Sequence, residues 1–355
     1  MVAVMLGKDI SMKKLPLAKA VGHALAHDLT QIAGNTKGPR FVRGHILREE
    51  DIPVLLDMGK HHIFVGEVPP GQVHEEEAGA VGAKVLAGEN IAISPPKEGR
   101  FALSATQKGV LCVNGKALNA LNATPDYTGV TLPNYTVCQV GQTVAGVRIV
   151  PLTTDVVNTQ KVENLESVYG KILHIKAFTG KKVGIVITGE EIFSGRIPDA
   201  FEGVLREKLS AFDATVLGAT ICPDNVEAIK TAATAFLDQG ADIIFFTGGM
   251  SVDPDDLTPT AIGALGGNVI SHGVPIQPGN MLLLAYLGNV ALLGLPGAVM
   301  HHKTTALDVL LPRVFADIAI SKEDISQMGE GGLCLFCDLC HYPVCYFGKG
   351  GAPCS

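Results

Sequence analysis

From Lys181 onward, apolar segments alternate with segments of helical pattern, and this alternation constrains the fold more than any other feature of the sequence. The apolar segments have the length of strands and lie at 183–187, 214–219 and 242–246. The helical segments lie at 199–212, 224–239 and 258–267. Strands without a polar face are typical of a parallel sheet covered by helices on both sides. We therefore predict an α/β domain with a parallel, doubly wound sheet.

The most apolar window of the chain, 281–300, carries no charged residue and is as long as a transmembrane helix. Gly288-Asn289 interrupts it at a position typical of a hairpin turn, and Gly294-Leu295-Pro296-Gly297 would end a helix. We therefore predict two buried strands, a helix at 298–311 and no membrane association. The first residues show no charged segment ahead of an apolar one and no cleavage site. This pattern predicts no signal peptide and a cytoplasmic location.

The length of 355 residues exceeds that of one ordinary domain. The chain is 47% hydrophobic and carries a net charge of −7 without a long Lys/Arg run, which argues for a large core and against nucleic-acid or anionic-membrane binding. We predict four regions. They are a helical segment (1–60), a smaller, strand-rich mixed α+β domain (61–177), the α/β domain (178–320) and a Cys-rich tail (321–355).

The N-terminal half contains three helical signals, at 17–28, 49–59 and 75–88. The second begins with acidic residues and a proline in its first turn, and Gly59 ends it. From 91 to 152 glycine, proline and β-branched residues are frequent, which indicates strands. In this region Asn114-Gly115 predicts a hairpin turn.

In an open parallel sheet, the ligand binds beyond the carboxyl ends of the strands. Three glycine-bearing loops follow the predicted strands there, at 188–199, 247–259 and 294–297. Such loops allow backbone N–H groups to approach an anion. They lack the Walker A and G-x-G-x-x-G patterns, which argues against a P-loop or a dinucleotide site. The predicted ligand-binding residues are Thr188, Gly189, Glu190, Thr247, Gly248, Gly249, Ser251, Asp253, Asp255, Pro296 and Gly297.

The second loop places three acids, Asp253, Asp255 and Asp256, within four positions. Their repulsion calls for a cation or a hydrogen-bonding ligand, and Mg²⁺ bridged to ligand phosphates would suit them. The alternative is a solvated acidic turn. Asp199 forms a D-x-x-E pattern with Glu202, so it is either a site residue or the cap of its helix.

These residues resemble a known family. Thr188-Gly189-Glu190-Glu191-Ile192, Thr247-Gly248-Gly249-x-Ser251, Asp256-Leu257-Thr258-Pro259 and Leu295-Pro296-Gly297 are similar, in this order, to the molybdopterin-binding domain. That domain occurs in enzymes that complete molybdenum cofactor biosynthesis and in competence-damage-type proteins. The resemblance covers 178–315 and implies a MogA/MoeA-like fold that binds a dithiolene pterin and its phosphate. It also implies a homo-oligomer and catalytic roles for Asp199 and Asp256.

The N-terminal part resembles the MoeA-type molybdotransferases in Gly22-His23-Ala24-Leu25-Ala26-His27-Asp28 and in the segment 51–59 after Gly44-His45. Three features of that branch are absent. The Ser-Ala-Met-Asp-Gly-Tyr-Ala-type loop is missing, Gln277-Pro278-Gly279-Asn280 replaces Lys-Pro-Gly-Lys, and the cysteine tail replaces a C-terminal β-barrel.

Three functions are therefore compatible with the resemblance. The first is a molybdotransferase that takes adenylylated molybdopterin and molybdate. The second is a non-catalytic molybdopterin carrier or chaperone for a molybdoenzyme. The third is a nucleotide hydrolase of the competence-damage type.

The tail carries cysteines in the pattern C-x2-C-x2-C-x4-C, at Cys334, Cys337, Cys340 and Cys345. Clustered thiols in a reducing compartment indicate metal ligands rather than disulfides. The dense spacing resembles that of iron–sulfur ferredoxins, and four thiolates would equally suit Zn²⁺. The alternative is a tail of free thiols.

Overall fold

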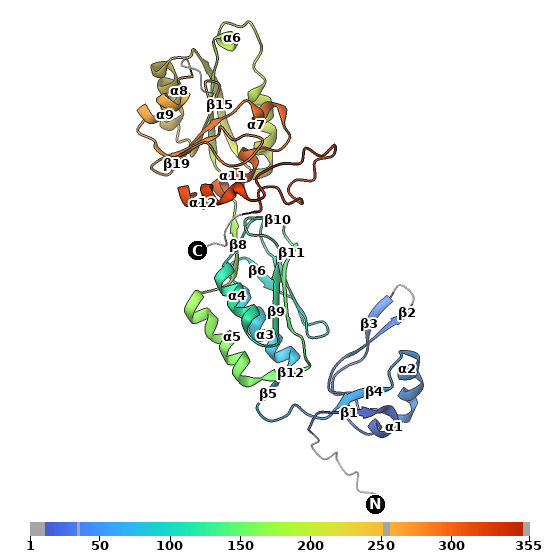
Figure 1. Cartoon of the computed structure of the whole chain (residues 1–355). Helices are drawn as coiled ribbons and strands as arrows, with labels where there is room; N and C mark the ends of the chain where they lie inside the picture. The colour runs from blue at the N-terminus through green and yellow to red at the C-terminus, as the bar shows by residue number, and fades with distance from the viewer. Residues whose placement is uncertain (1–10, 34–35, 251–255, 351–355) are drawn as a thin grey trace, which may run out of the picture.

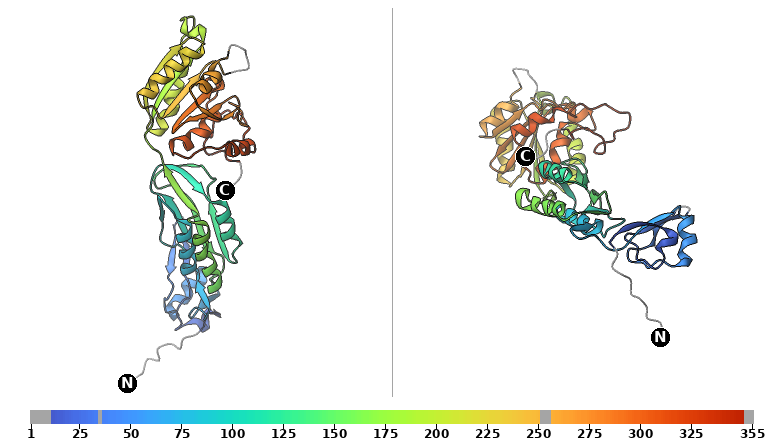
Figure 2. Two further views of the ribbon diagram at one scale, coloured as in Figure 1. Left: turned by 90° about the vertical axis from the view of Figure 1, so that its left-hand side faces the viewer. Right: turned by 60° about the horizontal axis from the view of Figure 1, so that its bottom comes forward.

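The computed structural model of the chain describes residues 11–33, 36–250 and 256–350. Three units follow one another along an elongated molecule (Figures 1 and 2). The N-terminal unit lies at one end, the C-terminal unit at the other, and a mixed unit connects them (Figure 1).

The N-terminal unit is a small body of short strands and helices. Strand β1 (Lys13–Pro16) pairs antiparallel with β4 (His62–Val65), and β2 (Leu29–Ala33) forms a hairpin with β3 (Thr36–Phe41). Leu25, Leu47, Leu55 and Val65 form part of its buried core. The predicted helix at 49–59 is confirmed as η1 (Glu49–Asp51) and α2 (Ile52–Asp57).

The predicted helix at 17–28 is wrong beyond its first turn. Helix α1 covers only Leu17–Ala20. Gly22 then adopts a φ of +83°, a left-handed conformation that ends a helix, and Leu25 forms an antiparallel bridge with Val65. Pairing with β4 therefore prevails over the helical periodicity of this segment.

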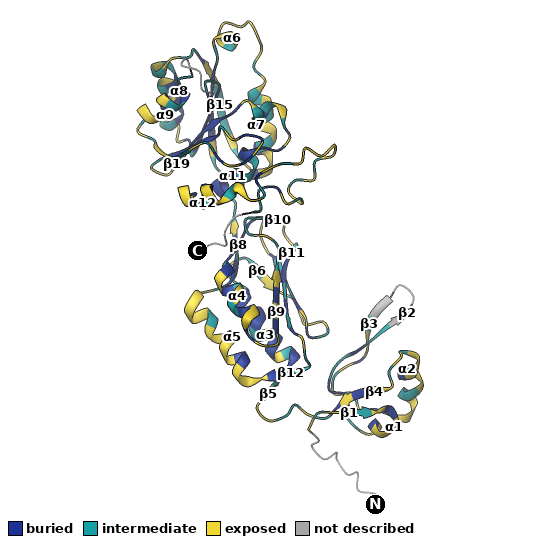
Figure 3. Ribbon diagram, in the orientation of Figure 1, coloured by how far each residue is buried: buried dark blue, intermediate teal, exposed yellow. Residues whose placement is uncertain are grey.

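The middle unit packs three helices against antiparallel sheets (Figure 1). One sheet has the order β6-β7-β11-β9, another the order β10-β8-β13, and β12 pairs with β5. The strands are β5 (Gln72–His74), β6 (Ile91–Ile93), β7 (Phe101–Ala105), β8 (Gly109–Val113), β9 (Tyr127–Thr131), β10 (Val137–Cys138), β11 (Thr143–Ile149), β12 (Thr153–Asp155) and β13 (Leu173–Ala177). The helices are α3 (Glu75–Leu86), α4 (Gly115–Ala123) and α5 (Val156–Tyr169). Figure 3 shows that α5 presents much exposed surface, whereas the strands are largely buried.

Asn114 begins a helix in this unit and does not form the predicted hairpin turn. Its side-chain oxygen accepts a hydrogen bond of 3.1 Å from the backbone N–H of Ala117, which caps α4. Asparagine is favoured both in hairpin turns and at helix N-caps, so the dipeptide signal was ambiguous. The predicted helix at 75–88 is confirmed as α3.

The C-terminal unit contains the predicted α/β sheet. Its strand order is β15-β14-β16-β19-β18-β17, and the first four strands run parallel. The strands are β14 (Lys182–Thr188), β15 (Thr215–Cys222), β16 (Ile243–Thr247), β17 (Asn268–His272), β18 (Leu283–Leu287) and β19 (Val290–Leu295). The predicted hairpin is confirmed, because β18 and β19 pair antiparallel across Gly288-Asn289. In the part of the chain that the structure describes, no helix is long and apolar enough to span a membrane.

Helices cover both faces of this sheet, as the apolar strands predicted (Figure 1). Phe245 packs in one core with α7 (Phe201–Leu209) and α11 (Ala306–Phe315). Its neighbour Phe246 points to the opposite core, with α8 (Val226–Asp238) and α9 (Thr258–Ala264). This alternation follows from the two-residue period of a strand.

The predicted helix at 298–311 is divided into α10 (Ala298–His301) and α11. The division arises because Thr305 caps α11 in a capping box with Asp308. After α11, helix α12 (Lys322–Ser326) and the turn η3 (Gln327–Gly329) lead into the cysteine-bearing segment, which lies against this unit (Figure 1).

Candidate ligand site at the carboxyl edge of the sheet

The connections of the sheet create a topological switch point between β14 and β16. Helix α7, which follows β14, packs on one face of the sheet, and α9, which follows β16, packs on the other. The chain therefore leaves β14 and β16 in opposite directions, which opens a crevice at their carboxyl ends. Thr188 and Thr247 are the last residues of these two strands.

Two glycines bring the loop after β16 directly against the end of β14. Gly248 has a φ of +84° and Gly249 a φ of +57°, values that residues with a side chain rarely adopt. A Cβ atom on Gly248 would overlap the carbonyl oxygen of Thr188. The hydroxyl of Thr258 donates a hydrogen bond of 2.9 Å to the carbonyl oxygen of Gly248, which fixes the loop. Gly248 is thus required by the close approach of two backbones, and Gly249 is favoured by its left-handed conformation.

Three buried polar atoms at this edge have no hydrogen-bond partner among the residues that the structure describes. They are the hydroxyl oxygens of Thr188 and Thr247 and Oδ1 of Asp224. Thr188 is 1% exposed and Thr247 is 0% exposed. A Cβ atom on Gly249 would lie 3.5 Å from the Thr188 hydroxyl and 3.6 Å from Asp224 Oδ1, so these two atoms surround one glycine.

An unsatisfied buried polar group costs about 1–3 kcal/mol, and most native structures avoid it. Two such groups around one glycine at a topological switch point indicate a site in which a ligand supplies the missing partners. The third, Thr247, ends the adjacent strand β16. Sites of this kind are frequently kept at a cost to stability.

Asp224 is a candidate ligand residue that the sequence interpretation missed. The sequence predicted a helix that begins at Asp224, but α8 begins at Val226, and its cap Asn225 accepts a hydrogen bond of 2.8 Å from the Ala228 N–H. Asp224 Oδ2 instead accepts one of 3.2 Å from the Glu190 N–H. The available signal was its position just after β15, at the edge where parallel strands end. Burial, with the Asp224 charge as a further cause, raises the pKa of the adjacent Cys222 to about 11.

The other predicted residues are distributed as follows. Glu190 begins α6 (Glu190–Phe193) directly after Gly189, and Pro296-Gly297 follows β19, which lies next to β16. Asp256 is half-buried in the loop that precedes α9. Ser251, Asp253 and Asp255 lie outside the described residues.

Asp199 forms a cap at the start of α7. Its two carboxylate oxygens accept hydrogen bonds of 3.0 Å each from the N–H groups of Phe201 and Glu202. Asp199 thus accepts from the first turn of α7, but the full D-x-x-E capping box is not formed, because Ala200 is the N-cap and the Glu202 side chain accepts a hydrogen bond from Arg206.

The described residues contain no group of three or more His, Cys, Asp or Glu placed to hold a metal ion. As the side chains stand, the predicted Mg²⁺ at the glycine loop and the predicted metal of the tail have no ready-made coordination sphere in this part of the chain.

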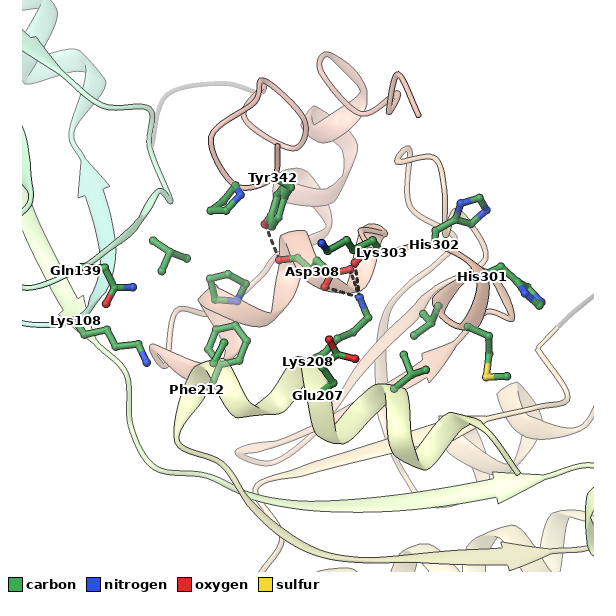
Figure 4. Close-up of a pocket in the computed structure, with 17 residues that line it drawn as sticks. Lys108, Gln139, Glu207, Lys208, Phe212, His301, His302, Lys303, Asp308 and Tyr342 are labelled. Atoms are coloured by element: carbon green, nitrogen blue, oxygen red, sulfur yellow. Dashed lines mark hydrogen bonds and ion pairs between the residues drawn. The ribbon is translucent and has the colours of Figure 1, made fainter. Parts of the chain in front are cut away.

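A separate cavity of about 610 Å³ lies between the C-terminal and middle units (Figure 4). Lys208 in its wall donates hydrogen bonds of 2.8 and 2.9 Å to the two carboxylate oxygens of Asp308, and one of 2.9 Å to the Lys303 carbonyl. Lys108 reaches the same cavity from the middle unit. The paired Lys208 and Asp308 thus hold α7 against the start of α11.

Comparison with known families identifies two segments of the chain. Residues 184–316 match the model described as "Probable molybdopterin binding domain", which spans the sheet and its glycine loops. The C-terminal domain is thus similar to molybdopterin-binding domains over this range. Residues 14–67, which form the N-terminal unit, match a domain of unknown function.

Curated relatives match part of the chain. A molybdopterin molybdenumtransferase of Synechococcus elongatus is 31% identical over 146 residues, which cover 38% of this chain and 36% of that protein. A CinA-like protein of Mycobacterium avium is 34% identical over 77 residues, or 22% of this chain and 18% of that protein. The chain therefore spans well under half the length of these relatives. Their similarity supports a general role in molybdenum cofactor biosynthesis.

Solved structures of related proteins give weak overall superpositions. The tungsten cofactor synthesizing protein MoaB from Pyrococcus furiosus is 21% identical, with a TM-score of 0.35, and covers 41% of this chain and 100% of that one. A molybdopterin biosynthesis MoeA protein from Pyrococcus horikoshii is 16% identical, with a TM-score of 0.30, and covers 87% of this chain and 76% of that one. The strand order described above defines the fold of the domain.

Proposed function

We propose that the C-terminal domain binds molybdopterin, or its adenylylated form, across the carboxyl ends of β14 and β16. The observation that carries the proposal is the set of unpartnered polar atoms of Thr188, Thr247 and Asp224 at the switch point. The pterin ring offers N–H donors to the Asp224 carboxylate. The turns at Gly189 and Gly248 offer backbone N–H groups to the phosphate.

In the catalytic form of this proposal, the domain completes the cofactor. Water adds across the phosphoanhydride bond of adenylylated molybdopterin, and AMP leaves. Molybdate, a substrate, exchanges one oxo group for the two dithiolene sulfurs, and this oxygen leaves as water with the two thiol protons. Asp224, which lies beside Gly249, and Asp256, in the loop before α9, position the reacting groups. A Mg²⁺ ion held by the same carboxylates would neutralise phosphate charge.

A carrier is the second candidate, and one observation favours it. Gln277-Pro278-Gly279-Asn280 stands where the molybdotransferases have two lysines, so two cations near the expected phosphate are absent. Gly279 packs closely against Thr305 and Ala306, which places this neutral loop beside the start of α11. A carrier would bind the pterin, deliver it to a molybdoenzyme and leave the adenylate intact.

The similarity to CinA-like proteins gives the third candidate, a nucleotide hydrolase. One set of measurements separates all three. The purified chain is incubated with adenylylated molybdopterin and molybdate, and pterin retention and AMP release are measured on the same sample. Asp256→Asn should retain the pterin and lose AMP release if the chain is a transferase. Retention without AMP release by the wild type indicates the carrier. Nucleotide hydrolysis without pterin retention indicates the hydrolase and contradicts the pterin proposal.

A further inference from the structure

A cavity of about 520 Å³ lies at the junction between the middle unit and the C-terminal domain. There α11 and α12 lie next to β8 and β10 (Figure 1). Its lining combines residues of both units, and none of these described residues belongs to the glycine loops at the carboxyl edge of the sheet. The volume is within the range of about 300–1,000 Å³ that is typical of small-molecule sites. The cavity is thus a candidate for a second ligand site.

Arg313 of α11 lines this cavity, although its side chain is only 3% exposed. Its Nη2 donates a hydrogen bond of 2.7 Å to the Ala319 carbonyl and one of 2.9 Å to the Asp324 carboxylate. Its Nε has no acceptor among the residues that the structure describes. A guanidinium group stays charged in proteins, and burying it is favourable only when its donors are paired. The protein therefore leaves the hydrogen bonding of this buried cation incomplete.

Tyr135 of the middle unit holds its ring against the same guanidinium. The Cζ atom of Arg313 lies 4.3 Å from the centre of the Tyr135 ring, which is the geometry of a cation–π contact. The Tyr135 backbone has a φ of +61°, a left-handed conformation that is rare for an aromatic residue and costs about 1–3 kcal/mol. Two hydrogen bonds to Leu111 of β8 hold this turn, since the Tyr135 N–H donates to its carbonyl at 2.8 Å and the Thr136 carbonyl accepts from its N–H at 2.9 Å. Strain of this kind is concentrated at binding sites, and here it places an aromatic ring in the wall of a cavity.

Two lysines line the cavity from opposite units. Lys116 lies in the first turn of α4, and Lys349 follows the cysteine segment. Neither forms an ion pair with a carboxylate of the described residues. The acidic residues of the lining are Glu323 and Asp324, and Arg313 pairs with Asp324. The cations of the lining therefore outnumber its carboxylates, which favours an anionic ligand.

Apolar side chains complete the wall of the cavity. Val309, Met328 and Phe347 line it, and Phe347 is 2% exposed. An inorganic anion would leave these side chains without a partner, whereas an organic anion would cover them with its own apolar surface. The lining thus fits a ligand that has both a charged group and an apolar body.

We propose that this cavity binds a small organic anion, whose carboxylate or phosphate group contacts Lys116, Lys349 and Arg313 and whose apolar body packs against Val309 and Met328. Ammonium and guanidinium groups donate charge-assisted hydrogen bonds to both kinds of anion. Because Lys116 belongs to the middle unit and Lys349 to the C-terminal domain, the bound anion joins the two units and stabilises their junction. The site is separate from the glycine loops, so it stands whether or not these loops bind a pterin.

The test is a calorimetric titration of the full chain with phenyl phosphate and with phenylacetate, which attach the two anionic groups to a similar apolar ring. Benzyl alcohol, which has the ring without the charge, is the control ligand. We expect at least one of the two anions to saturate a site and to bind about tenfold or more tightly than benzyl alcohol, because hydrogen bonds to charged groups are worth about 1.5–3 kcal/mol. The tighter of the two probes identifies the anionic group that the site prefers.

Lysine variants locate the bound anion. The double variant Lys116→Gln/Lys349→Gln should bind the tighter probe about tenfold or more weakly, whereas its pterin binding should equal that of the wild type. Lys161→Gln, which replaces an exposed lysine of α5 outside the cavity, is the matched control and should keep the wild-type affinity for the probe. The idea is overturned if neither anion saturates a site or if benzyl alcohol binds as tightly as both. Unchanged affinity of the double variant would also overturn it, because the anion would then bind elsewhere, such as at the glycine loops.

Discussion

The Asp224 carboxylate accepts a hydrogen bond of 3.2 Å from the backbone N–H of Glu190, and this bond joins the loops that follow β15 and β14. The second oxygen of the same carboxylate is buried without a partner. One oxygen of Asp224 thus holds two loops together, and the other oxygen is free to bind a ligand. The two functions can be separated by mutation.

We predict that Asp224→Asn weakens pterin binding by at least about tenfold, because a lost hydrogen bond to a charged group is worth about 1.5–3 kcal/mol. The asparagine oxygen can still accept the Glu190 N–H, so the melting temperature should change little. Asp242→Asn is the matched control, since Asp242 accepts a 2.8 Å hydrogen bond from the Lys182 N–H at the other end of the sheet. Equal binding by wild type and Asp224→Asn would remove Asp224 from the site.

We predict that Thr247→Val stabilises the protein and weakens ligand binding. Valine has the shape of threonine, and it removes a buried hydroxyl that has no partner, at a gain of about 1 kcal/mol or more. Thr258→Val is the comparison, because the Thr258 hydroxyl bonds to the Gly248 carbonyl and its loss should destabilise the loop. Denaturant unfolding and pterin titration check both effects. A destabilised Thr247→Val variant would mean that the hydroxyl has a structural partner.

We predict that Asp199→Ala lowers the free energy of unfolding by about 0.5–2 kcal/mol, the usual cost of losing a helix cap. Asp199→Asn should keep part of this stability, because its single amide oxygen can accept from only one of the two N–H groups of Phe201 and Glu202. Asp238→Ala, at the exposed end of α8, should change stability by less than about 0.5 kcal/mol. If Asp199→Asn folds normally and nevertheless loses AMP release, Asp199 acts in catalysis as well.

The sequence predicted the C-terminal sheet because its strands are apolar on both faces, a pattern that few other structures produce. It also predicted the glycine loops, since Gly248 and Gly249 carry backbone angles that their residue type permits. It failed where one residue type serves two purposes. Asn114 is suited to a turn and to a cap, and Asp224 to a cap and to a ligand site. Only the three-dimensional neighbours distinguish these uses.

Long-range pairing accounts for the other error. The segment after Ala20 has a helical pattern, but its backbone pairs with strand β4, which lies about forty residues further along the chain. Local periodicity contains no information about such a partner. The unpartnered polar atoms of the ligand site could not be predicted from the sequence either, because a hydroxyl without a partner is recognised only when the positions of its neighbours are known.

The last prediction concerns His74, which ties the N-terminal unit to the middle unit. The ring is 2% exposed. Its Nε2–H donates to the Ala26 carbonyl at 2.9 Å, and Nδ1 accepts from the Glu76 N–H at 3.3 Å and lies 3.0 Å from Arg43 Nη1. This arrangement favours a neutral ring, because a proton on Nδ1 would face two other donors, although Glu77 Oε2 also lies 3.4 Å from Nδ1.

Burial, and then the Arg43 charge, lower the His74 pKa below its ordinary value, although the Ala26 carbonyl, Glu77 and Glu76 oppose the shift. A histidine with a lowered pKa is protonated more readily when its unit is detached or unfolded. The contact between the units is therefore fully stable above the ordinary histidine pKa of about 6.5 and weakens as the pH falls below it.

We expect small-angle scattering to show a more extended wild type at about pH 5.5 than at about pH 8. His74→Asn retains a helix cap without a titrating ring, so its scattering should not change between these pH values. His62→Gln replaces an exposed histidine of β4, and its scattering should change with pH as that of the wild type does. A wild type whose dimensions are constant over this range would show that His74 does not control the contact.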